Sequence, residues 1–373
     1  MLKSRAVVVV IVAMVWLSAC VVKFDVRTTV AVVTGIPSIG APTLPSATPR
    51  PFTPTPPPTS TQTPTQTETP TLTPTLHPLS PYFVESLRAR SYTGGTIEIV
   101  ETLEQTSAYT SYLIAYPSDG LRITGMMNVP VGEGPFPVII LNHGHYDLSE
   151  YTTGRGTKNA ADIFARHGYL TLASDYRGHA GSDSGDNFFR TGYVVDVLNL
   201  VASVGSLPQA EADTIGMWGH SMGGGVAIEV MVVNPPGLRG VVLYGAMSGD
   251  MADNYYRIAF FRGQDTPGPD FPVLPEAAPE AYAQLSPINY LQYVGVPVII
   301  HHGDLDDQVP PDWSLRLQDA LKVAGKDSTL YTYPNAGHSF FDEDWNTFMG
   351  RNVEFFTSCA LSTSDCSTPR IPS

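Results

Sequence analysis

Residues 219–223 read Gly-His-Ser-Met-Gly, so that Ser221 stands between two glycines, after an apolar run and before a helical segment. In this strand–turn–helix setting the motif is typical of a nucleophile elbow, a tight turn that exposes a serine hydroxyl over the edge of a sheet. The glycines are needed because a Cβ at either position would collide with the neighbouring strand or helix. The pattern predicts Ser221 as a catalytic nucleophile, against the alternative of an incidental glycine-rich turn.

A nucleophilic serine needs a base, and the base needs a carboxylate that orients it, in the chain order Ser, Asp, His. Candidate carboxylates follow an apolar run that ends at Gly303, and they are Asp304, Asp306 and Asp307. Asp306 is preferred because it lies three residues after Gly303 and three before Val309, whose apolar side chain should anchor the loop. The other two aspartates would then be solvated loop charges or helix caps.

His338 lies in a glycine-containing loop after the last predicted strand, where its imidazole can swing over Ser221. This position and the chain order predict His338 as the general base. The alternative for this region is a metal site built from His301, His302 and the nearby aspartates. Adjacent residues of a strand point to opposite faces, so these two histidines cannot both face one ion. We therefore expect neither a metal nor a cofactor.

Two backbone N–H groups should stabilise the oxyanion that forms when a serine attacks a carbonyl. The first is that of Met222, directly after the nucleophile. The second should come from the loop after an early strand, where His143 and Gly144 let the backbone approach closely. The N–H of His145 is the candidate there, and that of Tyr146 is the second choice.

These groups predict hydrolysis of an ester or amide through an acyl-enzyme intermediate, with a small-molecule ester or a short peptide as substrate. The alternative from another class is a non-catalytic surface-binding module that retains the same fold.

Short apolar strands that alternate with helical segments must hold these residues in place. Alternating polar and apolar residues at 96–100 predict a first strand, and an antiparallel hairpin is predicted from residues 111–116 and 121–129. The later strands are predicted at residues 137–141, 169–173, 214–218, 240–244, 297–300 and 328–333, and the helices at 158–166, 193–204, 223–233, 313–324 and 345–358. Such alternation predicts an α/β protein with a mostly parallel sheet and helices on both faces. The active site should then lie at the carboxyl ends of the strands.

Several of these segments, in order along residues 94–356, resemble the catalytic domain of the prolyl oligopeptidase family. They are Ser118–Leu121, Pro135–Gly144, Asp175–Gly178, Ser286–Tyr290, His302–Asp306 and Ala324–His338. The resemblance implies an α/β-hydrolase fold with Ser221, Asp306 and His338 as its triad. It also implies a serine-type peptidase or, as in related stand-alone groups, an esterase of the feruloyl or acetyl xylan type or a dienelactone hydrolase. Peptidases of this family commonly carry a β-propeller before the catalytic domain, which the residues before Pro81 do not fit.

The N-terminal residues predict a lipoprotein signal peptide at 1–20. Two basic residues precede an apolar run, Ala6–Leu17, which is short for a membrane-spanning helix. Residues 17–20, Leu-Ser-Ala-Cys, resemble a bacterial lipobox, in which the cysteine thiol, here that of Cys20, receives the lipid. We therefore expect an extracytoplasmic protein anchored to a membrane through this lipid. An uncleaved signal anchor and free secretion are the alternatives.

Residues 21–80 predict a disordered stalk, because 13 Pro and 13 Thr occur between Ile36 and Ser80. Residues 81–373 should form the catalytic domain, which suits one large core. That domain carries 16 basic and 33 acidic side chains, so it should repel nucleic acid. The sequence leaves the oligomeric state open.

Two further segments leave alternatives open. Residues 249–285 carry aromatic residues among several Pro and Gly, and they predict either a lid or pocket wall or a surface insertion packed by its own aromatics; the aromatics considered are Tyr255, Tyr256, Phe260, Phe261 and Phe271. Cys359 and Cys366 are separated by six residues, so that outside the cytoplasm they could form a disulfide; two free thiols are the alternative.

Overall fold

The computed structural model describes residues 77–360, with side chains up to residue 358. The predicted signal peptide with Cys20, nearly all of the predicted stalk, and Cys366 of the predicted disulfide lie outside the described residues. Within residues 77–360, no helix combines the length and the apolar character that crossing a membrane requires.

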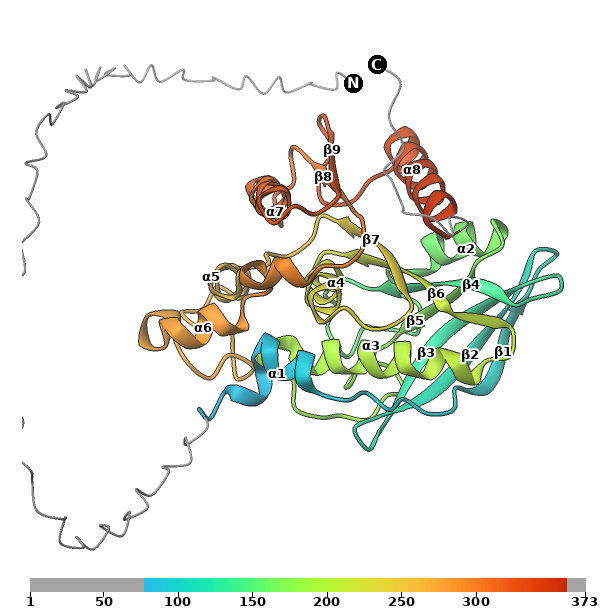
Figure 1. The fold of residues 1–373 in the computed structure, drawn as a ribbon, viewed down its shortest axis with the longest axis horizontal. Helices are drawn as coiled ribbons and strands as arrows, with labels where there is room; N and C mark the ends of the chain where they lie inside the picture. The colour runs from blue at the N-terminus through green and yellow to red at the C-terminus, as the bar shows by residue number, and fades with distance from the viewer. Residues whose placement is uncertain (1–76, 361–373) are drawn as a thin grey trace, which may run out of the picture. The chain divides into compact units, whose positions relative to one another are not determined.

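Within the described residues, nine strands form one sheet in the order β1-β2-β3-β5-β4-β6-β7-β8-β9 (Figure 1). Strands β1 to β3 and the pair β3–β5 are antiparallel, and every pair from β5–β4 to β8–β9 is parallel. The strands are β1 Glu98–Gln105, β2 Tyr109–Ser118, β3 Leu121–Pro130, β4 Phe136–Asn142, β5 Leu170–Ser174, β6 Ala210–His220, β7 Leu238–Tyr244, β8 Val298–Gly303 and β9 Ser328–Tyr333.

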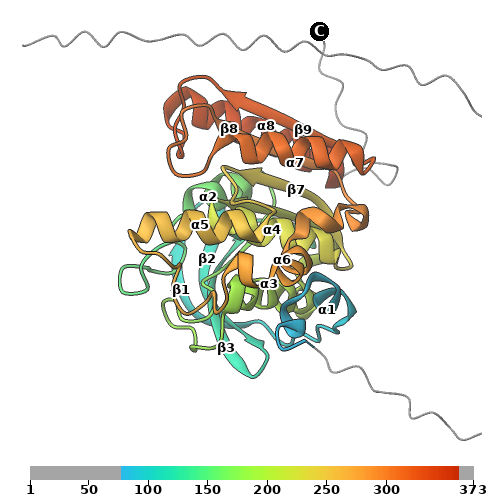
Figure 2. The same ribbon diagram turned by 90° about the vertical axis from the view of Figure 1, so that its left-hand side faces the viewer.

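Helices follow most of the parallel strands. They are α1 Val84–Ala89, α2 Lys158–Arg166, α3 Thr191–Ser203, α4 Met222–Val233, α5 Met251–Arg262, α6 Pro279–Leu285, α7 Pro311–Val323 and α8 Asp342–Ala360. Short 3-10 helices lie at Ser80–Tyr82, Phe188–Arg190, Val204–Ser206, Pro275–Ala277 and Pro287–Tyr293. Figure 2 shows β8, β9, α7 and α8 gathered at one end of the sheet.

The strand residues alternate between two apolar layers, as a period of two requires. In β4, Val138 and Ile140 pack in a core with residues of α3, α4 and α7. Ile139 and Leu141 of the same strand pack in a second core with residues of α2 and α8. Both faces of the parallel sheet are therefore covered, which explains why β4 and β8 are continuous apolar runs in the sequence.

The predicted α/β-hydrolase architecture is confirmed, with one addition. The predicted hairpin, β2 and β3, is extended by β1, which begins within the strand pattern at residues 96–100 and whose residues are all exposed. The segment at 249–285 contains the helices α5 and α6, which lie together away from β1–β3 (Figure 1). Helix α5 begins where the Asp250 side chain accepts a hydrogen bond from Ala252 N, and it ends at Gly263 in a left-handed conformation. Its apolar side chains include the exposed Phe260 and Phe261, so no single apolar stripe marks it in the sequence.

Candidate active site

Ser221 occupies the turn between β6 and α4 with an unusual backbone conformation, φ 57° and ψ −119°. Such a conformation is costly for a residue with a Cβ and persists where the surroundings enforce it. The enforcement here is a set of backbone hydrogen bonds: Ser221 N donates to Tyr244 O at 2.9 Å, and Ser221 O accepts from Met247 N at 3.0 Å. The turn therefore exposes the hydroxyl at the carboxyl end of β6.

The two glycines of the turn have the steric role that the sequence predicts. A Cβ on Gly219 would lie 2.3 Å from the carbonyl oxygen of Gly223, and a Cβ on Gly223 would lie 2.1 Å from that of Asn142. Neither distance is possible for real atoms, so any larger residue would displace β4 or α4 from the turn.

Asp306 and His338 are brought together from the loops after β8 and β9. The distance from Asp306 Oδ2 to His338 Nδ1 is 2.8 Å. Asp306 Oδ1 accepts hydrogen bonds from the backbone N–H groups of Gln308 and Val309, at 2.9 and 2.8 Å. The buried Val309 thus anchors the loop, and the carboxylate is fixed on both oxygens.

Within the described residues, neither of the other aspartates of this loop is hydrogen-bonded to His338. The exposed Asp304 accepts a hydrogen bond from the backbone N–H of Asn335 through Oδ1, so that it stabilises the turn after β9. Asp307 is exposed, and its backbone carbonyl accepts a hydrogen bond from Arg257. The structure therefore distinguishes Asp306 from its two neighbours.

His302 is a further partner of Asp306 that the sequence did not identify. Its Nε2 lies 3.1 Å from Asp306 Oδ2 and 3.0 Å from Val309 O, while its Nδ1 lies 2.6 Å from Ser314 Oγ. Burial raises the pKa of Asp306, but the hydrogen bonds from His302 and His338 outweigh it and hold this pKa well below the usual range. The Asp306 side chain is therefore ionised at any pH near neutrality.

His220, the second residue of the Gly-x-Ser-x-Gly motif, was also missed. Its Nε2 donates a hydrogen bond to the carbonyl oxygen of His338 at 3.1 Å, and its ring stacks on Tyr244 at 4.2 Å. Burial, with a smaller effect of His338, lowers the pKa of His220 to about 3, so the ring is neutral. It therefore holds the backbone of His338 without adding a charge to the site.

Ser221 and His338 line the same cavity, which has a volume of about 830 Å³. Within the part of the chain that the structure describes, the Ser221 hydroxyl forms no hydrogen bond, with His338 or with any other residue. Contacts of this kind often tighten only when a substrate binds.

The two candidate oxyanion residues also line this cavity. Met222 is the first residue of α4, so its N–H has no acceptor within the helix. His145 is exposed in the loop after β4, and the preceding Gly144 lies so close that a Cβ on it would be 3.3 Å from Ser221 Cβ. Tyr146, the second choice, lines the cavity as well.

A buried polar cluster fixes the loop that carries His145. The ring of His143 is stacked between Tyr151 and Tyr176, with 4.4 Å between ring centroids on each side. The Asp175 carboxylate accepts hydrogen bonds from Tyr151 and Thr153, at 3.0 and 2.8 Å, and the Asp175 carbonyl oxygen lies 3.2 Å from His143 Nε2, so that two parts of this loop are tied to the end of β5. Burial lowers the pKa of His143 to about 3, so its ring is neutral.

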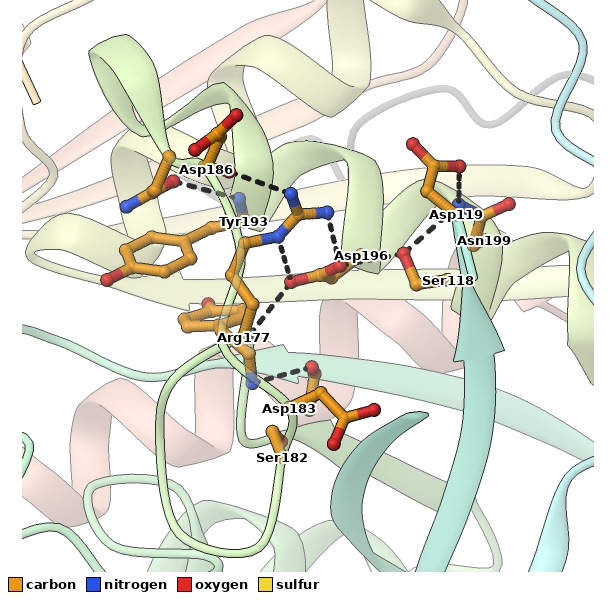
Figure 3. Close-up of polar contacts among 12 residues, drawn as sticks. Ser118, Asp119, Arg177, Ser182, Asp183, Asp186, Tyr193, Asp196 and Asn199 are labelled. Atoms are coloured by element: carbon orange, nitrogen blue, oxygen red, sulfur yellow. Dashed lines mark hydrogen bonds and ion pairs between the residues drawn. The ribbon is translucent and has the colours of Figure 1, made fainter. Parts of the chain in front are cut away.

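Figure 3 shows a second network, on the loop between β5 and α3. The buried Arg177 forms an ion pair with Asp196 at 2.8 Å and donates to the carbonyl oxygen of Asp186, also at 2.8 Å. Ser118 donates to the same Asp196 carboxylate at 2.7 Å. Because both charges are paired and hydrogen-bonded, they fix the course of this loop toward the cavity.

The segment at 249–285 forms part of the cavity wall through Ile258, Phe261, Arg262 and Asp270. It is also packed by its own aromatics, since Tyr255, Phe271 and Tyr282 share one apolar cluster. Both roles that the sequence left open for this segment are thus present together.

No group of three or more His, Cys, Asp or Glu side chains within residues 77–360 is arranged to hold a metal ion. His301 and His302 point to different surroundings, as adjacent strand residues must. His301 lies against Tyr331 and Phe348, whereas His302 contacts Asp306.

Comparison with known proteins relates the chain to one family. The profile of the prolyl oligopeptidase family matches residues 156–362, more than half of the chain. Among curated proteins, an uncharacterized peptidase of Bacillus subtilis, YuxL, is 41% identical over 54 residues, which are 14% of this chain and 8% of that protein. The chain therefore matches under a tenth of that relative's length.

Solved structures share the fold at low identity. An acylaminoacyl peptidase of Pyrococcus horikoshii superposes with a TM-score of 0.58 at 23% identity, covering 70% of this chain and 43% of the peptidase. Acetyl xylan esterase 1 of a Thermoanaerobacterium species superposes with a TM-score of 0.56 at 20% identity, covering 74% of this chain and 93% of the esterase. The structural likeness thus extends to peptidases and to esterases.

Proposed function

Because the chain belongs to the prolyl oligopeptidase family, we propose that it is a serine hydrolase that cleaves an ester or amide bond with Ser221, His338 and Asp306 as its triad. The observation that carries this proposal is the 2.8 Å contact between His338 Nδ1 and Asp306 Oδ2, beside a serine held in a strained turn on the same cavity.

The first half of the reaction forms an acyl-enzyme. Ser221 Oγ bonds to the substrate carbonyl carbon as its proton passes to Nε2 of His338. The ionised Asp306 accepts the Nδ1–H, so that Nε2 is free to take that proton and the imidazolium is stabilised. When the tetrahedral intermediate collapses, the bond to the leaving group breaks and Nε2 gives the proton to that group.

The second half repeats these steps with water. His338 removes a proton from a water molecule, whose oxygen bonds to the acyl carbon, and the bond to Ser221 Oγ then breaks as Oγ regains the proton. In both halves the negative oxygen is stabilised by the N–H groups of Met222 and His145. Each such donor contributes roughly 100-fold or more to kcat.

The substrate class within this reaction is a carboxylic ester or a short peptide. Labelling of the wild-type protein by a fluorophosphonate probe at Ser221, followed by a panel of 4-nitrophenyl acyl esters, aminoacyl amides and prolyl amides, tests the proposal. Turnover of any of these substrates together with labelling supports it. A folded protein that neither reacts with the probe nor hydrolyses any of them would instead be a non-catalytic binding module.

We further propose that the protein is a lipoprotein displayed outside the cytoplasmic membrane, attached through a lipid on Cys20. The support is the sequence Leu-Ser-Ala-Cys at residues 17–20, after a basic and then apolar segment. A diacylglyceryl group supplies two acyl chains, which together anchor a protein stably.

A further inference from the structure

Arg190 is a cation on the wall of the cavity that contains Ser221. Among the described residues, its guanidinium takes part in no ion pair and donates no hydrogen bond. Burial lowers the pKa of Arg190, although an arginine remains charged in proteins. A half-buried, unpaired guanidinium is costly, and an anion that enters the cavity would offset that cost.

The backbone at Arg190 has a strained conformation, which fixes the position from which the side chain extends. Phe189 and Arg190 have φ values of 53° and 65°, a left-handed region that residues with a Cβ seldom occupy. Phe189 is fully buried, and its N–H donates to Asp270 O at 2.8 Å. Non-glycine residues in this conformation persist only where their surroundings over-determine them, and they cluster at functional sites.

The ion pair and hydrogen bonds of Arg177 also help to hold this strained backbone in place. Arg177 binds the carbonyl oxygen of Asp186, three residues before Phe189, and it is itself held by Asp196 of α3 (Figure 3). The Asn187 side chain accepts a hydrogen bond from Tyr193 N at 3.3 Å. The loop is thus tied down before and after Arg190, so the guanidinium is presented to the cavity without a partner.

Four other charged side chains line the cavity: Arg262, Asp147, Glu150 and Asp270. Arg262 and Asp270 come from the segment at 249–285, and the carbonyl oxygen of Asp270 accepts the hydrogen bond from Phe189, next to Arg190. Asp270 forms no ion pair within the described residues, and burial raises its pKa, against the influence of Arg190 and then Arg262. The exposed Glu150 already faces Arg155 at 3.9 Å, and Asp147 is exposed to solvent. The cavity lining thus carries no net positive charge, and it is the unpaired guanidinium of Arg190 that would attract an anion.

The position of Arg190 in the cavity indicates which part of a substrate it would contact, the acyl part or the leaving group. The leaving group must face His338, because that residue gives it a proton. Arg190 instead shares with Met222 and Met247 the lining of a small inner cavity of about 30 Å³, as well as that of the main cavity. The acyl part of a substrate, which lies away from His338, would therefore approach Arg190.

We propose that Arg190 is a specificity-determining residue that selects substrates whose acyl group carries a carboxylate. This inference rests on the proposed function. A guanidinium binds a carboxylate through two parallel hydrogen bonds, and the apolar side chains around it suit a methylene stem. The expected substrates are thus half-esters or amides of dicarboxylic acids, or peptides cleaved after an acidic residue.

A pair of esters with the same leaving group tests the proposal on the full chain. The first is the mono-4-nitrophenyl ester of adipic acid, whose free carboxylate makes it anionic. The second is the same compound with that carboxyl converted to a methyl ester, which makes it neutral. We expect kcat/KM of the wild type to be roughly tenfold or more higher for the anionic ester than for the neutral ester, because one charge-assisted hydrogen bond strengthens binding by about that factor. Arg190→Gln should reduce this ratio to about one or below, and Arg190→Lys should retain part of it.

A matched control is Arg239→Gln, which removes an exposed arginine at the start of β7, at the other end of the strands. It should leave the ratio unchanged. A wild-type ratio of one or below, or an undiminished ratio in Arg190→Gln, would overturn the proposal. If Arg190→Gln fails to fold, Arg190→Lys, which keeps the charge but loses the planar fork, must still lower the ratio. Wild-type protein that hydrolyses neither ester and is not labelled at Ser221 would overturn the proposed function as well.

Discussion

Asp306 Oδ2 lies 3.1 Å from His302 Nε2, and the same oxygen lies 2.8 Å from Nδ1 of His338. One carboxylate oxygen thus serves two imidazoles. We infer that His302 is a positioning residue: it orients the carboxylate and helps to keep it ionised, whereas His338 acts on the substrate.

The variant His302→Leu, which has no side-chain donor, tests this role. Loss of the bond to a charged group should lower kcat by roughly tenfold and raise the pKa of Asp306. The acid limb of the kcat/KM profile against pH should therefore shift. A purely structural role would change stability and leave the shape of that profile as in the wild type.

Ser221→Ala should lower kcat by roughly four or more orders of magnitude, because removing a triad member leaves only the rate that binding and the oxyanion site provide. Circular dichroism should be unchanged. Fluorophosphonate labelling, followed by mass spectrometry, is the check, and a label retained by this variant would identify another nucleophile.

Among the acidic residues after β8, only Asp306→Asn should abolish most of the turnover, by roughly 10⁴-fold. An amide there stabilises the wrong tautomer of His338. Asp304→Asn and Asp307→Asn are the matched controls. In Asp304→Asn, the amide oxygen of the new side chain can still accept the hydrogen bond from the Asn335 N–H. In Asp307→Asn, the changed side chain is exposed. Steady-state kinetics of the three variants test the assignment of Asp306 to the triad, and a large loss of turnover at either control position would contradict it.

The sequence predicted the parts of this site that depend on local geometry. The turn around Ser221 is defined within five residues, and Val309 identifies Asp306 within one loop. The contacts of His220 and Arg190 were not predicted, because they depend on packing between distant segments. His220 meets a carbonyl 118 residues away, and the conformation of Arg190 depends on Asp270 and Arg177.

Helix α5 was missed for a related reason. Its buried side chains face an aromatic cluster as well as the cavity, and Phe260 remains exposed, so that the spacing of apolar residues does not repeat every three to four positions. A start signal was nonetheless present at Asp250, and a stop signal at Gly263.

Cys20→Ser should release the protein from the membrane fraction, because the proposed lipid is attached at this thiol. Mass spectrometry of the wild type should find an N-terminal peptide that begins at a lipid-modified Cys20. Membrane association as firm as that of the wild type in Cys20→Ser would favour an uncleaved anchor, and secretion of wild-type protein without lipid would favour a free enzyme.

Glu229, on α4, is a buried carboxyl whose Oε1 has no hydrogen-bond partner among the described residues. Burial raises the pKa of Glu229 to about 8, from an ordinary value of 4.5. The folded state therefore retains a proton between about pH 4.5 and 8 that the unfolded chain has lost. Stability must fall as the pH rises through this window, since the unfolded state binds fewer protons.

Glu229→Gln removes this titration while keeping the shape of the side chain. The free energy of unfolding of the variant should depend less on pH between about pH 5 and 8, and at about pH 8 it should exceed that of the wild type by a few kcal/mol, because each unit of pKa shift is worth about 1.4 kcal/mol. Urea unfolding at both pH values measures the difference. Glu354→Gln, at an exposed position of α8, is the matched control and should leave the wild-type pH dependence in place. Equal pH dependence in Glu229→Gln and the wild type would show that folding does not raise the pKa of the Glu229 carboxyl.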